Sequence, residues 1–341
     1  MKRWVVGLLL LLVLVNGVAA EEPRDNYNEF ESLQLLFSLE SGVEFIPTEN
    51  TPKVEMFQAD ISFFPKDNGY LQVNNLKTEE TAPAEVEIKE YISFKWRNPA
   101  PTQLFYKINA DLTTVNRLIP IQKRVSFPLR NVDEKLLQYT KPTDFIDVTP
   151  EIEQKARSVI GGENDFYVVV FNVAEWTKKN VEYNLSTLTA EVVQKSSWVL
   201  RNKKGVCDEL TNLFISMLRS VGVPARFVSG MVYSNIDYKW GAHGWAEVYF
   251  PEVGWIPFDV TFGQYGWIDP SHIKLKESLD SGSPSAEYTW RADGVQVKMK
   301  ELVVDAKLQG AQGKNDPPVK ISLQPAHAEA QFGSYVPLIV T

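Results

Sequence analysis

Hydrophobic and polar positions alternate with a period of two in the N-terminal third of the chain. After a polar lead-in, in which we expect one short helix around 30–39, alternation is clearest over 86–96 and returns over 104–112 and 124–129. Successive side chains of a strand point to opposite faces, so this pattern predicts half-buried strands. Turn-forming pairs such as Asn98-Pro99 separate them. We therefore predict a β-rich N-terminal domain over 21–145.

The hydrophobic period becomes helical from about residue 149. Thr149-Pro150 combines a capping hydroxyl with proline at the first helical position. The apolar spacing predicts four helices, which we place over 150–160, 165–180, 189–200 and after Gly205. Strand-like segments follow, at 225–234, 243–250 and 255–262. Helices followed by antiparallel strands predict an α+β domain over 146–278.

Turn-forming residues at 281–285 mark a linker, and strand-like patterns return over 295–308 and 319–323. They predict a separate β-rich C-terminal module over 286–341. The last residues, 336–341, are apolar and strand-like. We expect either that the natural chain continues beyond them or that this strand docks into a sheet.

The first twenty residues have the pattern of a targeting segment. Lys2 and Arg3 precede an apolar run over 4–15, and small residues stand before Glu21. The run is short for a membrane span, so we predict a signal peptide over 1–20. An uncleaved membrane anchor is the alternative. Either way, the body of the protein is expected outside the cytoplasm, secreted or held at the membrane.

Composition narrows the function classes. Hydrophobic residues make up 44% of the 341 positions, which is enough for a sizeable buried core. The formal net charge is -8. A chain this acidic is a poor partner for the phosphates of nucleic acids, so we predict no nucleic-acid partner.

The chain has one cysteine, Cys207. It cannot form an internal disulfide, so it is buried and inert, paired with another chain, or used chemically. Cys207 lies in the first turn of the predicted helix, where free N–H groups and the helix dipole favour a thiolate and a developing oxyanion. Gly205 leaves room for a substrate carbonyl to approach. A structural cysteine on the buried stripe of the helix fits the local pattern equally well.

A thiol nucleophile needs a base and a group that orients the base. His243 lies on one predicted strand and Asp259 on the next. If Phe250 pairs with Trp255, Asp259 falls opposite Ala246, about 10 Å along the strand from His243. A bulge, sheet twist or different turn is then needed to join them.

The other titratable residues suggest no further site. His272 and His327 lack a partner motif, and three scattered histidines give no zinc pattern, so we predict neither a metal nor a cofactor. We expect Asp208 and Glu209 to suit the helix dipole, and Glu247 to be solvated or salt-bridged.

Three segments resemble the motifs of the transglutaminase-like superfamily. They are Gly-Val-Cys207 with its helix and the Leu218-Arg-Ser-Val-Gly-Val-Pro-Ala-Arg226 sequence, His243-Gly-Trp-Ala-Glu-Val-Tyr-Phe, and Gly254-Trp-Ile-Pro-Phe-Asp259. The resemblance implies a papain-type core with Cys207 as nucleophile, His243 as base and Asp259 as orienting residue. It also implies a structural role for Arg226 near the helix end. Some relatives add a side-chain oxyanion donor, for which the candidates are Tyr183, Trp176 and Trp198.

The resemblance implies thiol-dependent acyl transfer from an amide. If water resolves the thioester, the enzyme is a peptidase or amidase, and if an amine does, it is a transglutaminase. The expected substrates are peptide, protein or cell-envelope amides. A non-catalytic scaffold or an envelope binding protein is the alternative, and an intermolecular disulfide through Cys207 is a third.

Overall fold

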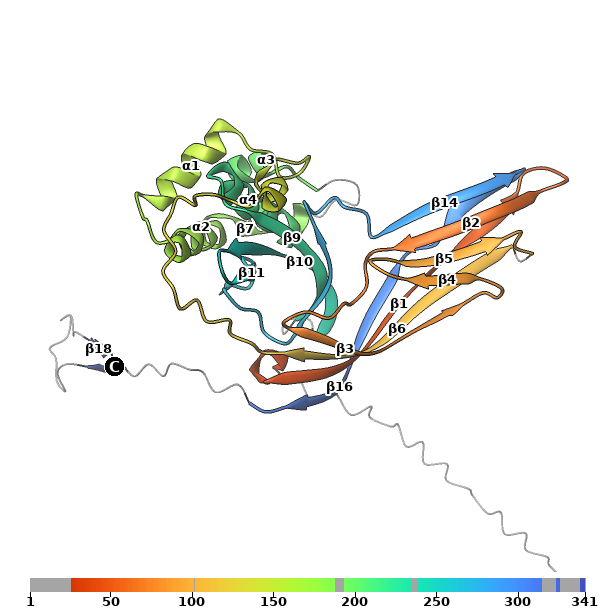
Figure 1. The fold of residues 1–341 in the computed structure, drawn as a ribbon, viewed down its shortest axis with the longest axis horizontal. Helices are drawn as coiled ribbons and strands as arrows, with labels where there is room; N and C mark the ends of the chain where they lie inside the picture. Colours follow the sequence, from red (N-terminus) through yellow and green to blue (C-terminus); the bar gives the residue numbers. More distant parts are fainter. Residues whose placement is uncertain are drawn as a thin grey trace, which may run out of the picture.

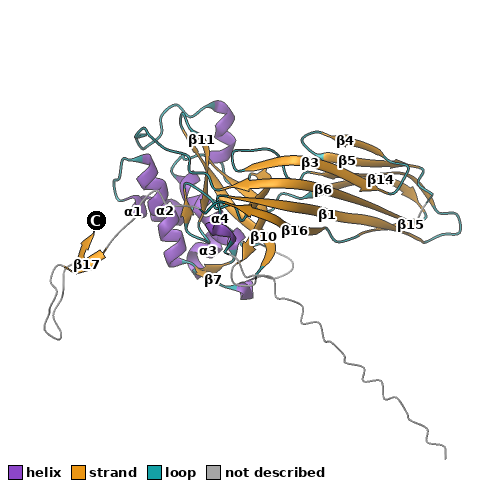
Figure 2. Cartoon of the chain, turned by 90° about the horizontal axis from the view of Figure 1, so that it is seen from below, coloured by secondary structure: helices purple, strands orange, loops and turns teal. Residues whose placement is uncertain are grey.

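The computed structural model describes residues 26–100, 102–187, 193–234 and 238–314, and the backbone of 323–325 and 338–340. A long β-sandwich lies beside a unit in which helices pack on a separate sheet (Figures 1 and 2). Short strands β17 (Leu323–Pro325) and β18 (Leu338–Val340) pair only with each other among the described strands. The predicted signal peptide over 1–20 lies outside the described residues. Among those that are described, no helix has the length and apolar character needed to cross a bilayer.

The sandwich consists of two antiparallel sheets. One has the order β15-β1-β6-β3 with β16 also paired to β1, and the other has the order β14-β2-β5-β4. Their bounds are β1 (Ser32–Pro47), β2 (Lys53–Ile61), β3 (Leu71–Glu80), β4 (Glu85–Ile88), β5 (Ile92–Arg97), β6 (Gln103–Val115), β14 (Ala286–Asp293), β15 (Val295–Met299) and β16 (Val303–Gln312).

Strand β1 corrects the prediction of a short helix over 30–39. Leu33, Leu35, Phe37 and Leu39 are each at most 2% exposed, while the residues between them face outward or are partly exposed. This is the period of a strand buried on one face. The predicted strand over 124–129 is also wrong, because only an isolated bridge from Ser126 to Asp165 forms there.

Strands β14, β15 and β16 belong to the sandwich rather than to the separate module predicted over 286–341. Strand β14 pairs with β2, and β15 and β16 pair with β1 along almost its whole length. Without them, β1 and β2 would be exposed sheet edges. The N-terminal domain predicted over 21–145 therefore needs residues from the other end of the chain to complete its sheets.

The helical unit is built around α4 (Cys207–Ser220). Its other helices are α1 (Pro150–Ile160), α2 (Phe166–Asn180) and α3 (Ser196–Asn202), with short 3-10 turns η1 (Tyr27–Glu29), η2 (Glu134–Thr140) and η3 (Leu185–Thr187). The sheet has the order β12-β11-β10-β9-β13. Its strands are β9 (Ala225–Ser234), β10 (Lys239–Phe250), β11 (Gly254–Asp259), β12 (Gln264–Tyr265) and β13 (His272–Ser278), and β7 (Glu182–Tyr183) pairs with β8 (Lys204–Gly205).

Helices α1, α2 and α4 begin close to where the sequence patterns predict them. Thr149 Oγ1 accepts the N–H of Ile152 at the start of α1, as the cap pattern predicts. Helix α4 is buried all round, rather than along one stripe, since its residues from Glu209 to Arg219 are all buried. Its polar side chains bond to neighbouring segments; Ser216 Oγ, for example, donates to the carbonyl of Asp147 at 2.6 Å. The start of the third predicted helix, at 189, lies outside the described residues.

The two parts of the molecule share a core. Met231 and Tyr233 of β9 and Ile273 of β13 belong to the same buried cluster as the inward side chains of the sandwich. At this junction Thr114 Oγ1 of β6 donates to the carbonyl of Pro270 at 2.5 Å. The sandwich thus supports the segment that leads into β13.

Candidate active site

The turn before Cys207 is shaped by the buried carboxylate of Glu209. It accepts the backbone N–H of Val206 at 3.0 Å and that of Gln194 at 3.1 Å. A Cβ on Gly205 would lie 2.5 Å from the Cβ of Glu209. Glycine is therefore needed at 205 for Glu209 to fold beneath the turn.

The sulfur of Cys207 lies between Asp208 and Gly244. Its thiol donates weakly to Asp208 Oδ1 at 3.7 Å, and Gly244 packs so closely there that a Cβ on it would lie 2.6 Å from the same oxygen. Burial, and after it the Asp208 carboxylate, raises the pKa of the Cys207 thiol above its usual range. The helix terminus therefore does not by itself yield the thiolate that the sequence predicts, and deprotonation requires a base.

The raised thiol pKa predicts the pH dependence of alkylation. Iodoacetamide should modify native Cys207 slowly at neutral pH, with a rate that rises about tenfold per pH unit between about pH 6 and pH 9, because thiolate is the reactive form. At about pH 7.5 the urea-unfolded chain should react faster, since its thiol regains a pKa near ~8.5. Intact mass measures both rates, because the chain has one cysteine. A native rate already constant from about pH 5 upward would contradict a protonated resting thiol.

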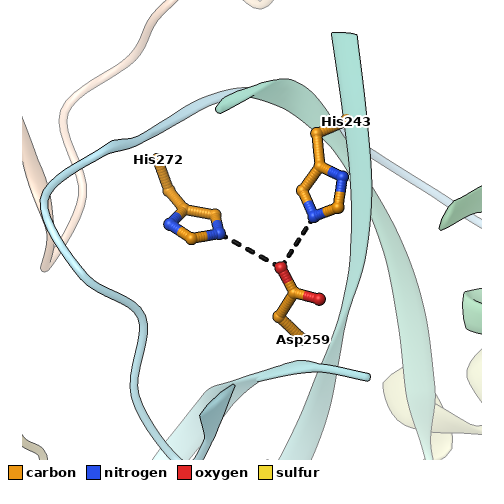
Figure 3. Close-up of side chains that lie close together, drawn as sticks. All are labelled: His243, Asp259 and His272. Carbon is orange, nitrogen blue, oxygen red and sulfur yellow. Dashed lines mark hydrogen bonds and ion pairs between the residues drawn. The ribbon is translucent and has the colours of Figure 1, made fainter. Parts of the chain in front are cut away.

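His243 and Asp259 come together because the hairpin has a register one residue different from the predicted one. Phe250 pairs with Gly254 rather than Trp255, which places Asp259 next to the Phe258–Ala246 pair, level with Trp245. Trp245 and His243 share a strand face, so Asp259 now faces the imidazole. Asp259 Oδ2 lies 2.7 Å from His243 Nε2 (Figure 3).

The carboxylate of Asp259 is fully buried and has four hydrogen-bond donors. Oδ1 accepts the backbone N–H groups of Thr261 and Phe262 at 2.7 and 3.0 Å. Oδ2 lies near both His243 Nε2 and His272 Nε2. Although burial opposes ionisation, the charge and hydrogen bond of His243, with those of His272, hold the pKa of Asp259 well below its usual value.

His272 is the site residue that sequence reasoning missed. Its Nε2 lies 3.1 Å from Asp259 Oδ2, on the opposite side from His243 (Figure 3). The one available signal was a histidine at the start of the strand after the Asp259 motif. That signal is weak, because β13 reaches the site by pairing with β9, and no local pattern encodes this pairing.

The same three side chains, His243, Asp259 and His272, offer ligand atoms within 4.8 Å of one another. Two imidazoles and a carboxylate are a donor set that Zn²⁺ can use. Here both imidazole nitrogens lie at hydrogen-bonding distance from the same carboxylate oxygen. Shared protons account for the cluster, and the set needs no ion to explain it.

Tyr183 is the oxyanion candidate that the structure brings to the nucleophile turn. It pairs with Gly205 through β7 and β8, and burial followed by the charges of Cys207 and Asp208 raises the pKa of Tyr183 to about 12. Trp176 instead has Lys203 over its ring at 4.3 Å. Trp198 packs against the helical core.

Charged residues outside the site form ion pairs across the sheet and hydrogen bonds at the end of α4. Glu247 is buried and bonds to Arg226 at 2.6 Å and to Lys274 at 2.7 Å, which fits the expected salt-bridged role. Arg226 thus pairs across strands rather than near the helix end. It is Arg219 that binds the carbonyls around the end of α4, including that of Ala225 at 2.9 Å. A cavity of about 480 Å³ near α2 has no member of the His243 cluster in its lining.

Part of the helical unit is similar in sequence to a known family. Residues 153–260 match the family model described as the transglutaminase-like superfamily. YebA of Bacillus subtilis is 35% identical over 100 residues, which cover 25% of this chain and 13% of YebA. A protein-glutamine gamma-glutamyltransferase of Pseudomonas aeruginosa is 29% identical over 68 residues, covering 18% of this chain and 10% of that protein. The chain thus spans a small part of either relative.

Solved structures show the fold. A crystal structure from Cytophaga hutchinsonii, described as a proposed cysteine protease, has a TM-score of 0.59 at 15% identity and covers 84% of this chain and 94% of that one. The match confirms the predicted α+β class, in which a helix packs on an antiparallel sheet. Residues 153–260, with the motif segments around Cys207, His243 and Asp259, are thus similar in sequence to the transglutaminase-like superfamily, and the Cytophaga structure shows the fold.

Proposed function

We propose that this protein is a thiol-dependent acyl-transfer enzyme that acts on amide bonds of peptides or proteins. Cys207 is the nucleophile, His243 the base and Asp259 the group that orients the base. The observation that carries the proposal is the 2.7 Å contact between His243 and a buried, ionised Asp259, on the strand whose next residue, Gly244, packs against Asp208 beside Cys207.

The hydrogen bond to Asp259 selects the tautomer of His243. An ionised carboxylate only accepts, so the proton of the neutral ring lies on Nε2, and Nδ1 keeps its lone pair. Figure 3 shows Nδ1 on the side of the ring away from Asp259. Nδ1 is therefore the atom that receives the thiol proton. Because the raised pKa keeps the Cys207 thiol protonated, a base must remove its proton, and His243 is that base.

The reaction follows in two halves. Sγ bonds to the amide carbonyl carbon as its proton passes to His243 Nδ1, and the carbonyl π electrons move to oxygen. The oxyanion collapses, the C–N bond breaks, and His243 returns the proton to the leaving nitrogen, which leaves a thioester on Cys207. Water or an amine then attacks the thioester, giving its proton to His243. The C–S bond breaks and the sulfur regains a proton from His243.

Two groups near the nucleophile can donate hydrogen bonds to the oxyanion. The backbone N–H of Cys207 lies at the start of α4, where N–H groups have no partner within the helix. The hydroxyl of Tyr183 is a donor of high pKa beside the same turn. A group that stays protonated at neutral pH can donate a hydrogen bond throughout the cycle.

Trapping the thioester tests the proposal. The protein is incubated with a glutamine-containing peptide at about pH 8, quenched in acid and examined by intact mass. We expect an adduct of peptide mass less ammonia on the wild type that hydroxylamine removes, and none on Cys207→Ala. Adding a primary amine distinguishes the resolving nucleophile, since a transglutaminase forms the peptide amide and a hydrolase forms the acid. Absence of an adduct across glutamine and backbone-amide peptides would favour the non-catalytic scaffold.

A further inference from the structure

His272 lies between two carboxylates. Its Nε2 is 3.1 Å from Asp259 Oδ2, and its Nδ1 is 3.2 Å from Asp269 Oδ1. The ring is buried and forms a T-shaped contact with Trp245 at a centroid distance of 5.3 Å. It is therefore held by polar contacts at both nitrogens and by an aromatic ring at its side.

Asp269 is ionised, like Asp259. Its Oδ1 accepts the backbone N–H of Ser271 at 2.8 Å and the Ser271 hydroxyl at 2.5 Å, while Oδ2 accepts the side-chain amide of Gln264 at 2.5 Å. Burial opposes ionisation, but the charge and hydrogen bond of His272 and these other donors lower the pKa of Asp269.

Two ionised acceptors fix the protonation of the ring between them. A neutral imidazole has one N–H, so one of its nitrogens would turn a lone pair toward a carboxylate oxygen. An imidazolium donates to both. Against the effect of burial, the charge of Asp269 and the hydrogen bonds to Asp259 and Asp269 raise the pKa of His272 to about 10.

We propose that His272 is a permanently cationic positioning residue, which anchors Asp259 and offsets its charge so that His243 stays neutral and able to accept a proton from Cys207. The catalytic consequence rests on the proposed function, whereas the charge state of His272 does not. His272 touches neither the sulfur nor the substrate position in this scheme. It acts through Asp259.

The charges around His243 show why a cation is needed there. Asp259 faces it from β11 and Asp269 lies one ring further away, while Asp208, a carboxyl whose pKa burial raises, interacts with it from α4. Ionised carboxylates around the ring would stabilise His243 as an imidazolium, which cannot take the thiol proton. The centroid of the His272 ring is 5.8 Å from that of His243, close enough for a positive charge to oppose this protonation.

The sandwich holds His272 in place. The carbonyl of Pro270 accepts the Thr114 hydroxyl from β6, and the carbonyl of Ser271 accepts the N–H of Tyr233 from β9. The segment between Asp269 and His272 is thus fixed from both parts of the molecule. This gives the β-sandwich a part in positioning the candidate site.

Nitrogen-15 NMR of labelled histidine tests the proposal directly, without substrate. The chain has three histidines, and His327→Gln identifies the third signal. In the wild type, His272 should stay protonated at both nitrogens through pH 8 and release a proton only near pH 10. In His272→Gln, which removes the charge but keeps an N–H donor for Asp259, the measured titration midpoint of His243 should lie above that of the wild type.

Each outcome decides the proposal. A His272 ring with a single proton at pH 7 in the wild type overturns it even if no variant folds. Equal His243 midpoints in the wild type and His272→Gln also overturn it. His272→Phe removes the donor as well as the charge, so a midpoint that rises only in this variant would indicate a hydrogen-bonding role alone and contradict the charge role.

The rate profile separates this inference from the proposed function. If the protein transfers acyl groups, the acid limb of kcat/KM should move upward in His272→Gln by the same amount as the His243 midpoint. If the NMR shifts appear but no acyl transfer is found with wild type, the charge role of His272 stands and the proposed function fails.

Discussion

Cys207→Ala should abolish acyl transfer, with a loss of at least about 10⁴-fold in kcat, because members of a nucleophile–base pair act as a unit and what remains is binding and oxyanion stabilisation. The fold should persist, since alanine at the first position of α4 keeps the turn that Glu209 holds through Val206. The measurement is release of ammonia or amine from the peptide that forms the adduct, with circular dichroism to verify folding.

Asp208→Asn is the matched control for Cys207→Ala. It alters the adjacent residue, which contacts the sulfur, and removes a charge that raises the thiol pKa. It should lower that pKa and leave the nucleophile in place, so alkylation at neutral pH should become faster, while adduct formation persists. Full activity in Cys207→Ala would show that the chemistry lies elsewhere.

Asp259→Asn should lower kcat by about 10³- to 10⁴-fold, because an amide can hold His243 in the wrong tautomer and cannot stabilise its imidazolium. The same change should reduce the free energy of unfolding by about 3–5 kcal/mol, since it removes the partner of a buried cation at His272. Urea unfolding measures the second effect and the peptide assay the first.

Asp293→Asn, at an exposed carboxylate in β14, is the control for Asp259→Asn and should change neither quantity. Stability of Asp259→Asn equal to wild type at neutral pH would mean that His272 is neutral there. It would therefore contradict the ion pair, whereas a kcat of Asp259→Asn equal to that of the wild type would contradict the orienting role.

Local sequence signals predicted the helical unit closely. The cap at Thr149, the stripe after Cys207 and the alternation around His243 each reflect side chains within a few residues, and the structure has an element at each place. The prediction of a helix over 30–39 is wrong, because the run from Leu33 to Leu39 lies in β1. A short apolar run is ambiguous because its period is sampled only a few times.

The sequence by itself determined the α+β class and brought Cys207, His243 and Asp259 to notice as candidates, because motif spacing and hydrophobic period are local properties. Only the tertiary structure decided three other features. The one-residue register that turns Asp259 toward His243 depends on the β10–β11 turn. Strands β14–β16 join the β-sandwich by pairing with strands more than 200 residues earlier in the chain, and no local pattern encodes this pairing. The thiol pKa of Cys207 and the double contact of His272 depend on burial and on charges that converge from separate strands, and these exist only once the chain has folded.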